Sequence, residues 1–564
     1  MTEFPVLSTT AADEAHFERS SSSPSSSRLP HPLTDPTLSY WIDTSSAPSS
    51  RYGIQSVPST EDDTAVDVAI IGSGITGVSA AYHLLHELGT STTSSIKSIV
   101  VFEAREFCSG ATGRNGGHLT PVSALAYTDI ASNPAHLSRN ISTTVNVQSK
   151  GANGAPLSRT DDVVRRILTL EQRTASELIS LVQQEAKHGK GSEEEENEDV
   201  ELVNKKNWHL CFTPSEEAAF ESSLQAATQA GLSDFVHLIR KVSQEECNRA
   251  LSRPIGVLCA FEIPGSTLHP RRLVAALWRA AFRRASSSGQ VSLKMYTHTP
   301  IERISYPDST SQATHSVLHT TQGKRFRARF VVHATNAYIS HLAPQLAGPK
   351  HGVVPTRAQC ISALPSIPSP SPAATATTNT SWDKGISLHS GYEYLHQRPP
   401  SKVPLSPSSS AHEGEASPFI FGGGRYLSDT MEYDISNDGS VHPAISHFLR
   451  SFLPSTFPRS FSSSSTEATP LLAPVSHEWT GIIGMTHSKD PLVGPLPSPS
   501  TEEGTGGRVE RHYVSAGYSG HGMTRAFACA RIVAQMVIAE ERGCLDRWTV
   551  PDWFPTCYLT MLPS

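Results

Sequence analysis

The chain has 564 residues, with 46 Lys and Arg against 53 Asp and Glu and a formal net charge of −7. This length is enough for two or three domains, and so balanced a charge argues against a dedicated binder of nucleic acid or of anionic membranes. No stretch approaches the roughly 18 apolar residues that a membrane helix needs, and the first residues lack the pattern of a secretory signal. We therefore expect no nucleic-acid partner and no membrane partner.

The eight cysteines are scattered along the chain and form no C-x-x-C pair. This pattern is typical of a reducing compartment and argues against both a disulfide scaffold and a zinc site. We expect a cytoplasmic protein without a metal.

Segments rich in Ser, Pro or acidic residues interrupt the chain, and such compositions bury too little apolar surface to offset the entropy of ordering. We expect residues 1–55 to be a disordered Ser/Pro-rich arm and the other segments to be surface loop insertions. A phosphorylation-regulated docking segment is the alternative. The expected insertions are residues 190–201, 364–381, 399–418 and 454–469.

A β-α-β pattern opens the ordered part of the chain. Residues 66–71, VDVAII, predict a buried strand, and apolar residues then recur every three or four positions from Ile75 to Leu88, as in a helix. Residues 98–103, SIVVFE, predict the next strand, so the two strands belong to a parallel sheet. Further patterns predict helices at 163–186, 271–285 and 527–541, and strands at 329–335 and from 513.

The turn after the first strand reads G-S-G-I-T-G over residues 72–77. Its glycines permit a tight turn, close approach of the backbone to a pyrophosphate, and close packing of helix on sheet. The following helix N-terminus offers unpaired N–H groups to phosphates. Glu103, at the end of the second strand, is placed to accept a hydrogen bond from a ribose hydroxyl. The pattern predicts a dinucleotide site, although a glycine turn kept only for packing is the alternative.

A second Gly-rich stretch, GATGRNGGH, covers residues 110–118. A nicotinamide site does not need it, whereas a flavin ring must lie against backbone near the pyrophosphate. This stretch therefore favours a flavin and argues against an NAD-dependent dehydrogenase.

With these motifs the chain resembles the FAD-dependent D-amino-acid-oxidase-like superfamily, and most closely its branch of glycine and sarcosine oxidases and gamma-glutamylputrescine oxidoreductase. The motifs occur in the family's order between about residues 55 and 540, and SYWID (39–43) is similar to an element of fungal members. Further matching stretches are HPRRLV (269–274), YTHTPIERI (296–304), VVHATNAY (331–338), VPTRAQ (354–359), GYEYLHQRP (391–399), FGGGR (421–425), EWTGIIGMTHSKDPLVGP (478–495) and SAGYSGHGM (515–523).

The resemblance implies an α/β fold, with a Rossmann-like FAD-binding domain built on a parallel sheet and an α+β substrate domain built on a mixed sheet. The FAD-binding domain is expected to be discontinuous, over residues 56–150, 256–348 and 476–545. The substrate domain is expected at 151–255 and 349–475.

The resemblance also assigns cofactor contacts. The first glycine turn should cradle the pyrophosphate, Glu103 the ribose, and the second Gly-rich stretch the flavin, while residues 520–523 should offer backbone N–H groups to the N1/O2 edge of the ring. The expected FAD-binding residues are Gly72, Ser73, Gly74, Ile75, Thr76, Gly77, Glu103, Ala104, Arg105, Gly110, Ala111, Arg114, Asn115, Gly116, Gly117, His118, Ile301, Ala334, Thr335, Gly520, His521, Gly522 and Met523. Some relatives tether FAD through a histidine where this chain has Arg114, and others through a cysteine in the segment that corresponds to residues 481–486, GIIGMT, which has none. We therefore expect non-covalent FAD.

Four residues are candidates for substrate contact. Tyr394 and Trp479 are aromatic residues on expected substrate-domain strands, and each has a core-packing alternative. Arg357 could bind a substrate carboxylate or form a structural ion pair. His521 could assist a proton transfer or be a structural histidine, as could His118. Arg425 is a further candidate for the lining of the substrate site.

The predicted function is FAD-dependent oxidation of a C–N bond in a small amine, namely an amino acid, an N-methyl amino acid or an acylated polyamine. Hydride passes to flavin N5, the imine is hydrolysed, and oxygen or another acceptor reoxidises the flavin. The alternative is a non-catalytic flavin-binding trafficking or interaction protein of the same fold.

Overall fold

The computed structural model describes most of the chain, and every statement below concerns that part. The described residues are 15–18, 30–89, 94–138, 150–152, 154, 156–188, 199–306, 315–365, 382–399, 417–461, 472–499 and 507–561.

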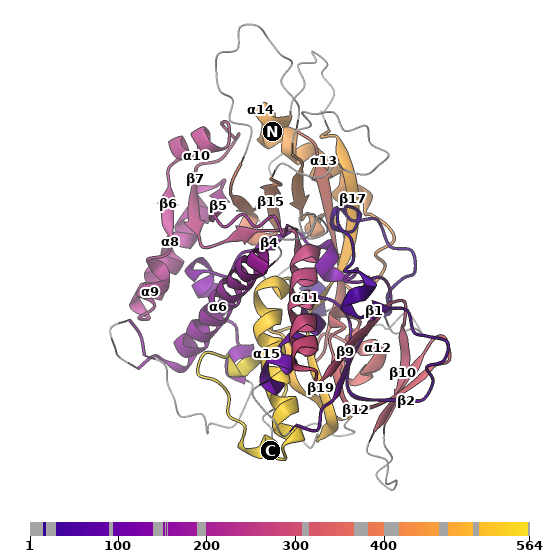
Figure 1. Cartoon of the computed structure of the whole chain (residues 1–564). Coiled ribbons are helices and arrows are strands. Elements are labelled where there is room, and N and C mark those ends of the chain that lie inside the picture. The colour runs from indigo at the N-terminus through magenta and orange to yellow at the C-terminus, as the bar shows by residue number, and fades with distance from the viewer. Residues whose placement is uncertain are drawn as a thin grey trace.

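Two sheets organise the molecule, one in the lower half and one in the upper half of Figure 1. The lower sheet has nine strands, and six of them run parallel in the order β1-β9-β3-β2-β12-β19. Strands β10, β11 and β18 join it antiparallel. Its strands are β1 Ile54–Gln55, β2 Thr64–Ile71, β3 Ser98–Phe102, β9 Ser292–Tyr296, β10 Ile301–Ser305, β11 Ser316–Thr320, β12 Arg325–His333, β18 Leu492–Pro497 and β19 Arg508–Ala516.

Four long helices build the core beside the parallel sheet: α3 (Ile75–Leu88), α6 (Arg159–His188), α11 (Pro270–Ser288) and α15 (Gly522–Glu541). Helix α3 packs against both α11 and α15, and α15 also packs against α6. In α11 the His269 side chain caps the first turn, Pro270 opens the helix, and Gly289 ends it in the left-handed conformation. Buried apolar residues of these helices and of the strands form one continuous core.

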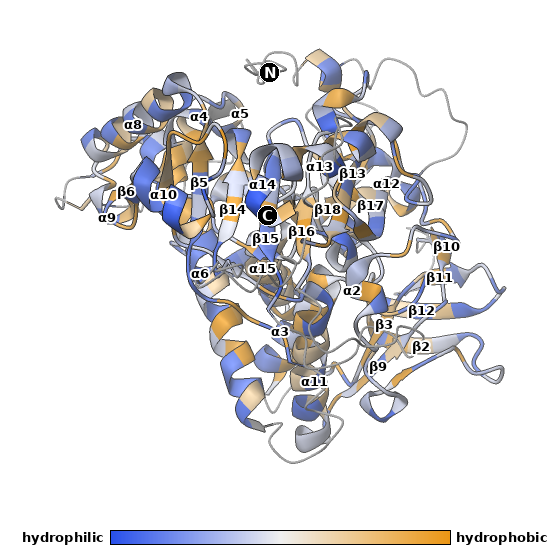
Figure 2. Ribbon diagram, turned by 90° about the horizontal axis from the view of Figure 1, so that it is seen from above, coloured by the Kyte–Doolittle hydropathy of each residue, from blue (hydrophilic) through white to orange (hydrophobic). Residues whose placement is uncertain are grey.

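The upper sheet is mixed and has eight strands in the order β17-β13-β16-β15-β14-β5-β7-β6, with β14 and β5 as its parallel pair. Figure 2 shows apolar residues along its strands and polar residues on covering helices such as α8. Its strands are β5 Asn207–Cys211, β6 Arg240–Val242, β7 Cys259–Ile263, β13 Val354–Ala363, β14 Gly385–Leu388, β15 Glu393–Gln397, β16 Phe419–Gly422 and β17 Val475–Met485. A two-stranded ribbon pairs β4 (His118–Leu119) with β8 (Ser266–Thr267).

Shorter helices complete the fold. The remaining helices are α2 Tyr40–Asp43, α4 Tyr127–Ala131, α5 Ala135–Ser138, α8 Pro214–Gln229, α9 Ser233–Val236, α10 Gln244–Ala250, α12 Ile339–Leu342, α13 Pro443–Thr456 and α14 Pro458–Phe461. The two-sheet α/β architecture confirms the expected fold class, and the β2-α3-β3 unit confirms the first predicted pattern.

The boundaries differ from the expected ones in three places. Strands β7 and β17 pair within the upper sheet, although both lie in segments assigned to the FAD-binding domain. Helix α6 packs on α15, although residues 151–255 were assigned to the substrate domain. Long-range strand pairing and helix docking decide these memberships, and local composition does not encode them.

The expected disordered arm needs correction, because residues 30–55 are packed on the fold. Trp41 is fully buried, and β1 pairs in parallel with β9. The expected insertion at 454–469 is helical in its described part, through the end of α13 and α14. Most of the other predicted insertions, and residues 1–14 and 19–29 of the arm, lie outside the described residues.

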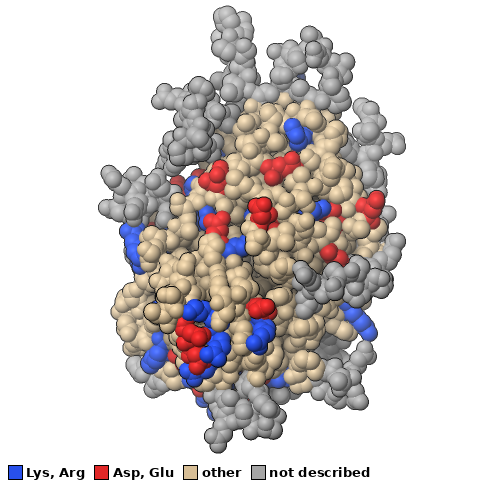
Figure 3. Space-filling view, turned by 90° about the vertical axis from the view of Figure 1, so that its right-hand side faces the viewer, with Lys and Arg blue, Asp and Glu red and all other residues tan. Residues whose placement is uncertain are grey.

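Charges are interspersed on the surface, as on the face in Figure 3, where Lys and Arg alternate with Asp and Glu among the described residues. One described helix, α15, has the length and apolar composition of a membrane span, but 83% of its most apolar stretch is buried inside the fold. Its contacts with α3, α6 and β19 are those of a core helix.

The contact between the first glycine turn and α3 gives a stability prediction. A Cβ atom on Gly77 would lie 1.9 Å from the carbonyl oxygen of Gly72, so Gly77→Ala must push α3 away from β2. We expect a loss of about 3 kcal/mol in the free energy of unfolding, measured by urea denaturation. Gly110→Ala is the matched control, because a Cβ there meets nothing within 4 Å and its φ is −79°. Equal stability of the two variants would contradict the packing role of Gly77.

Candidate functional site

A cavity of about 1760 Å³ lies between the carboxyl ends of the parallel strands and one face of the upper sheet. Its walls come from the turns after β2, β3, β12 and β19 on one side and from β13, β14, β15 and β17 on the other. Ligands of open parallel sheets bind at this end of the strands. The volume exceeds the 300–1,000 Å³ usual for small-molecule sites, so it can hold a dinucleotide together with a small substrate.

The first glycine turn presents an uncapped helix end to the cavity. Gly74 is the N-cap residue of α3, and no side chain caps this end, although the Thr112 hydroxyl accepts a hydrogen bond from the Ile75 N–H at 3.1 Å. Gly72, Gly74, Ile75 and Thr76 line the cavity. The first turn of α3 therefore has N–H groups left for a phosphate.

Ser73 and Gly77 have a different role from the one predicted, because neither lines the cavity. The backbone N–H and the hydroxyl of Ser73 both donate to Glu103, at 2.9 and 2.7 Å, and the same hydroxyl accepts from the Cys108 N–H at 2.8 Å. Ser73 thus ties the first glycine turn to the end of β3, and Gly77 packs α3 onto the turn.

Glu103 lines the cavity at the end of β3, as a ribose-binding acid should. One of its oxygens accepts the two bonds from Ser73, and the other accepts from the Arg105 N–H at 3.0 Å. A carboxylate offers about four acceptor positions, so one remains for a ribose hydroxyl. The carboxylate is oriented before any ligand arrives.

The second Gly-rich stretch is held from behind through four successive carbonyl groups. Residues Gly113 and Arg114 end the short 3₁₀ helix Ala111–Arg114, and Arg114, Asn115 and Gly116 line the cavity. The bonds to these carbonyls come from Ser39 to Gly113 (2.6 Å), Trp479 to Arg114 (2.8 Å), Trp41 to Asn115 (2.6 Å) and His396 to Gly116 (2.9 Å). These bonds fix the successive peptide planes against which a flat ring can lie.

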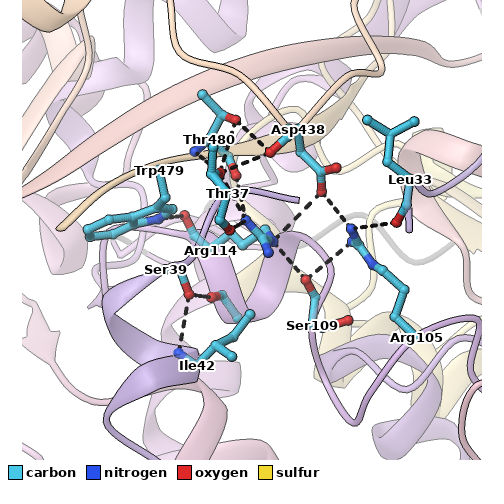
Figure 4. A network of polar contacts seen from close by, with 12 residues as sticks. Leu33, Thr37, Ser39, Ile42, Arg105, Ser109, Arg114, Asp438, Trp479 and Thr480 are labelled. Carbon is cyan, nitrogen blue, oxygen red and sulfur yellow. Dashed lines mark hydrogen bonds and ion pairs between the residues drawn. The ribbon is translucent and has the colours of Figure 1, made fainter. Parts of the chain in front are cut away.

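A buried ion network joins this stretch to the upper half of the molecule (Figure 4). The Asp438 carboxylate lies 2.9 Å from Nη1 of Arg105 and 3.7 Å from Nε of Arg114, and all three side chains are at most 10% exposed. Arg114 also donates to the carbonyl oxygens of Ser109, Thr37 and Thr480. Both arginines line the cavity, but their charged groups serve the scaffold.

The segment before α2 contributes to this network, which its composition does not predict. Thr37 accepts from Arg114 and donates its N–H to the Asp438 carbonyl at 2.8 Å, and the Leu33 carbonyl accepts from Arg105 at 3.4 Å. His31, Pro32, Leu33 and Thr34 line the cavity. Although its composition is rich in Ser and Pro, this segment forms part of the cavity wall.

The turn between β19 and α15 closes the cavity at another side. Gly520, His521, Gly522 and Met523 all line it. The Asn336 side chain, from the turn after β12, accepts from the Gly517 N–H at 2.9 Å. Helix α15 therefore begins with its first N–H groups at the cavity.

Tyr394 lines the cavity from the upper sheet, and its ring occupies the space between two glycines. A Cβ on Gly116 would lie 2.2 Å from this ring, and one on Gly422 would lie 2.6 Å from it. The hydroxyl lies 3.3 Å from Sγ of Cys360, and burial raises the pKa of Tyr394 well above its ordinary value. The phenol therefore stays neutral and serves as an apolar wall.

Arg425 also lines the cavity, and among the described residues its guanidinium pairs with no carboxylate. It donates to the Met431 carbonyl at 2.9 Å and lies 5.3 Å from the centre of the Tyr433 ring. Among the arginines that line the cavity, Arg425 is the one without a carboxylate partner in the described part of the chain.

Trp479 and Arg357 do not reach the cavity, contrary to their predicted substrate contact. Trp479 is fully buried among Tyr40, Trp41 and Cys360, where it supports the second Gly-rich stretch. Arg357 forms a buried ion pair with Glu432. Arg357 lies on the opposite face of β13 from the cavity-lining Ala358, and register within the sheet decides that face. Trp479 lies on the same face of β17 as the cavity-lining Gly481, but the second Gly-rich stretch covers it.

All but one of the other predicted cofactor residues line the cavity. Gly117 packs against Trp41 instead of lining the cavity. The remaining predicted residues that line it are Glu103, Ala104, Arg105, Gly110, Ala111, Arg114, Asn115, Gly116, His118, Ile301, Ala334 and Thr335.

These residues fit a flavin dinucleotide. The buried hydroxyl of Thr335 lines the cavity and has no hydrogen-bond partner among the described residues, which is the state of a group that awaits a ligand. The oriented Glu103, the uncapped start of α3 and the backbone wall at 113–116 supply places for the adenosine ribose, the pyrophosphate and the ring, which is the order of these groups in FAD.

The ion network predicts the effect of Asp438→Asn. The variant leaves Arg105 and Arg114 buried without a counter-charge, which costs about 3 kcal/mol of unfolding free energy in urea denaturation. Glu245→Gln is the control, because Glu245 and its partner Arg249 are 83% and 71% exposed and such pairs contribute little. An Asp438→Asn variant as stable as the control would show that the arginines do not depend on this carboxylate.

Comparisons with known proteins agree with this geometry. A family model described as FAD dependent oxidoreductase (DAO) matches residues 67–536. A search of curated proteins by sequence found no match.

Solved structures show the same fold at low identity. Glycine oxidase from Geobacillus kaustophilus is 17% identical over 84% of this chain and 95% of its own, with a TM-score of 0.52. L-proline dehydrogenase from P. horikoshii is 15% identical over 88% and 98%, with a TM-score of 0.52. Iminodiacetate oxidase from Chelativorans sp. BNC1 is 14% identical over 88% and 100%, with a TM-score of 0.51. The matched length and the two-sheet fold lead to one conclusion: the chain belongs to the DAO family of FAD-dependent oxidoreductases.

Proposed function

We propose that this protein oxidises the C–N bond of a small amine that carries a carboxylate, such as an amino acid or an N-methyl amino acid. The observation that carries this proposal is a single cavity that joins a dinucleotide cradle to a chamber lined by Tyr394, Arg425 and His521. The substrate is a small molecule, and oxygen or another acceptor takes up the electrons.

Arg425 supports the choice of a carboxylate-bearing amine. It lines the cavity, and its guanidinium has no carboxylate partner among the described residues. A guanidinium pairs with carboxylates through two parallel hydrogen bonds. Glycine, L-proline and iminodiacetate, named for the similar structures, each carry a carboxylate one carbon from the amine nitrogen. Acylated polyamines lack this group and are the less favoured class.

The protein's own groups bind, orient and exclude water. When bound, FAD supplies the two-electron acceptor. Arg425 would hold the carboxylate, Tyr394 would pack against the apolar part of the substrate, and the backbone at 113–116 would fix the plane of the ring. The first turn of α15 would direct N–H groups and the positive end of its dipole toward the cavity, where negative charge is stabilised.

We also propose that FAD is held without a covalent bond. Arg114 directs its guanidinium to the carbonyl oxygens of three neighbouring segments, and no described cavity residue is a cysteine. All eight cysteines are free thiols, which supports a cytoplasmic location as part of the proposal.

An anaerobic titration tests the reaction class. The purified protein should be yellow, and at least one of glycine, sarcosine, L-proline and N-acetylputrescine should bleach it. Dithionite provides the control for a reducible flavin. A yellow protein that dithionite bleaches and none of these amines does would favour the non-catalytic flavin-binding alternative.

Arg425→Met tests the carboxylate contact. Loss of a charge-assisted hydrogen bond of about 1.5–3 kcal/mol should raise KM for a carboxylate-bearing substrate by about 10- to 100-fold. The matching amine without a carboxylate should be oxidised slowly, and at the same rate by wild type and by the variant. Equal losses for both amines would assign Arg425 a structural role.

A further inference from the structure

A buried carboxylate lies behind the turn that begins α15. Glu171, in the middle of α6, is fully buried, and its side chain accepts hydrogen bonds from the Val122 N–H at 2.8 Å, the Thr524 hydroxyl at 2.7 Å and Nε of Arg525 at 2.7 Å. Thr524 and Arg525 belong to the first turn of α15. A carboxylate that is buried from water therefore contacts the first turn of α15 at the cavity wall.

His521 lies between this carboxylate and the cavity. Its Nδ1 is 3.6 Å from Oε1 of Glu171, and its side chain is 42% exposed and lines the cavity. The other ring nitrogen, Nε2, bonds to no described residue. The imidazole is thus placed with one nitrogen toward a buried anion and the rest of the ring open to the cavity.

We propose that Glu171 and His521 form a proton-accepting pair for the substrate, with His521 as the base and Glu171 as its positioning residue. This inference rests on the proposed function. An amine enters largely as an ammonium ion, which has no electron pair to support loss of hydride. Transfer of one proton from the ammonium nitrogen to Nε2 leaves the electron pair on that nitrogen and gives a neutral amine and an imidazolium. The imidazolium then returns its proton to water through the open cavity.

Glu171 is suited to this role because it remains ionised. Burial alone would raise the pKa of its carboxyl, but Arg525, His521 and the hydrogen-bond donors hold that pKa well below its ordinary value. An ionised acceptor beside Nδ1 favours the tautomer with the proton on Nδ1, which leaves the lone pair of Nε2 for the substrate. It also stabilises the imidazolium that forms. Apo hydrogen bonds of catalytic groups are often long and shorten on binding.

The surrounding charges are largely paired with one another. Arg525 is neutralised by Glu171 and donates to the Lys489 carbonyl at 2.8 Å. Asp490, next to Lys489, faces His136 of α5, with 3.0 Å between Oδ2 and Nε2. Lys489 itself lines the cavity. His521 is the histidine of this set that both faces Glu171 and lines the cavity.

His118, the other cavity histidine near the second Gly-rich stretch, is a poorer base. Burial lowers its pKa to about 4, and its Nδ1 lies 3.2 Å from the Gly116 carbonyl oxygen. A base works best when its pKa is near the operating pH. His118 is therefore poorly suited to accept the proton.

The test compares the pH dependence of anaerobic flavin reduction in wild type, Glu171→Gln and His521→Asn, using whichever of glycine, sarcosine, L-proline or N-acetylputrescine bleaches wild type. At pH 7 both variants should be slower by about 10²- to 10⁴-fold, the usual contribution of a general base. Near pH 10, where the free amine is abundant, they should recover to within about tenfold of wild type. Glu171→Asp should recover part of the rate at pH 7.

Glu177→Gln is the matched control, because Glu177 also lies on α6 and pairs with an arginine of α15, Arg531, but outside the cavity. Its profile should match wild type. FAD content and dithionite bleaching verify each holoenzyme, and His521→Asn carries the test if Glu171→Gln does not fold. Profiles of both His521→Asn and Glu171→Gln that keep the wild-type shape overturn the inference alone. If no amine in the panel bleaches wild type, the proposed function falls and the inference falls with it.

Discussion

The buried carboxylate of Asp438 is the contact on which the arrangement of the cavity depends. It faces Arg105, two residues after Glu103, and Arg114, which lies within the second Gly-rich stretch. Because Asp438 follows β16 of the upper sheet, this single anion joins the two halves of the molecule across the cavity. Removing charges from water is costly, and the protein offsets that cost by giving Arg114 four further acceptors, including Thr37 of the N-terminal segment.

Because most buried charges are paired with one another, few side chains of the cavity are left for chemistry. Of the four arginines on the cavity, Arg105 and Arg114 share Asp438 and Arg525 pairs with Glu171, so Arg425 alone remains without a carboxylate among the described residues. The carbonyl groups of 113–116 are likewise all bonded from behind. Such a site suits chemistry that a cofactor performs, because the protein contributes orientation, dryness and local charge.

Local patterns were sufficient for the fold class and for the dinucleotide cradle. The β2-α3-β3 unit, the long helices and the glycine turns follow from apolar periodicity and turn chemistry, and most predicted cofactor residues line the cavity. Arg357 could not be placed, because sheet register decides which face a strand residue takes. Trp479 could not be placed, because long-range packing with Trp41 and the second Gly-rich stretch covers it. The position of Glu171 could have been predicted from the spacing along α6. Glu171 lies three residues after Leu168 and four before Ala175, which puts an acid on the apolar face of the helix. The packing of the N-terminal segment could not be predicted in this way, because its polar residues form long-range hydrogen bonds.

The most direct measurement of the central claim is a crystal structure of the yellow holoprotein. The account predicts one FAD in the cavity, with its ribose at Glu103, its pyrophosphate at the start of α3, and its ring between the 113–116 backbone and the first turn of α15. The ring should face Tyr394 and leave His521 open to the substrate chamber. A flavin bound elsewhere, or one in the reverse direction with its ring at Glu103, would contradict the account.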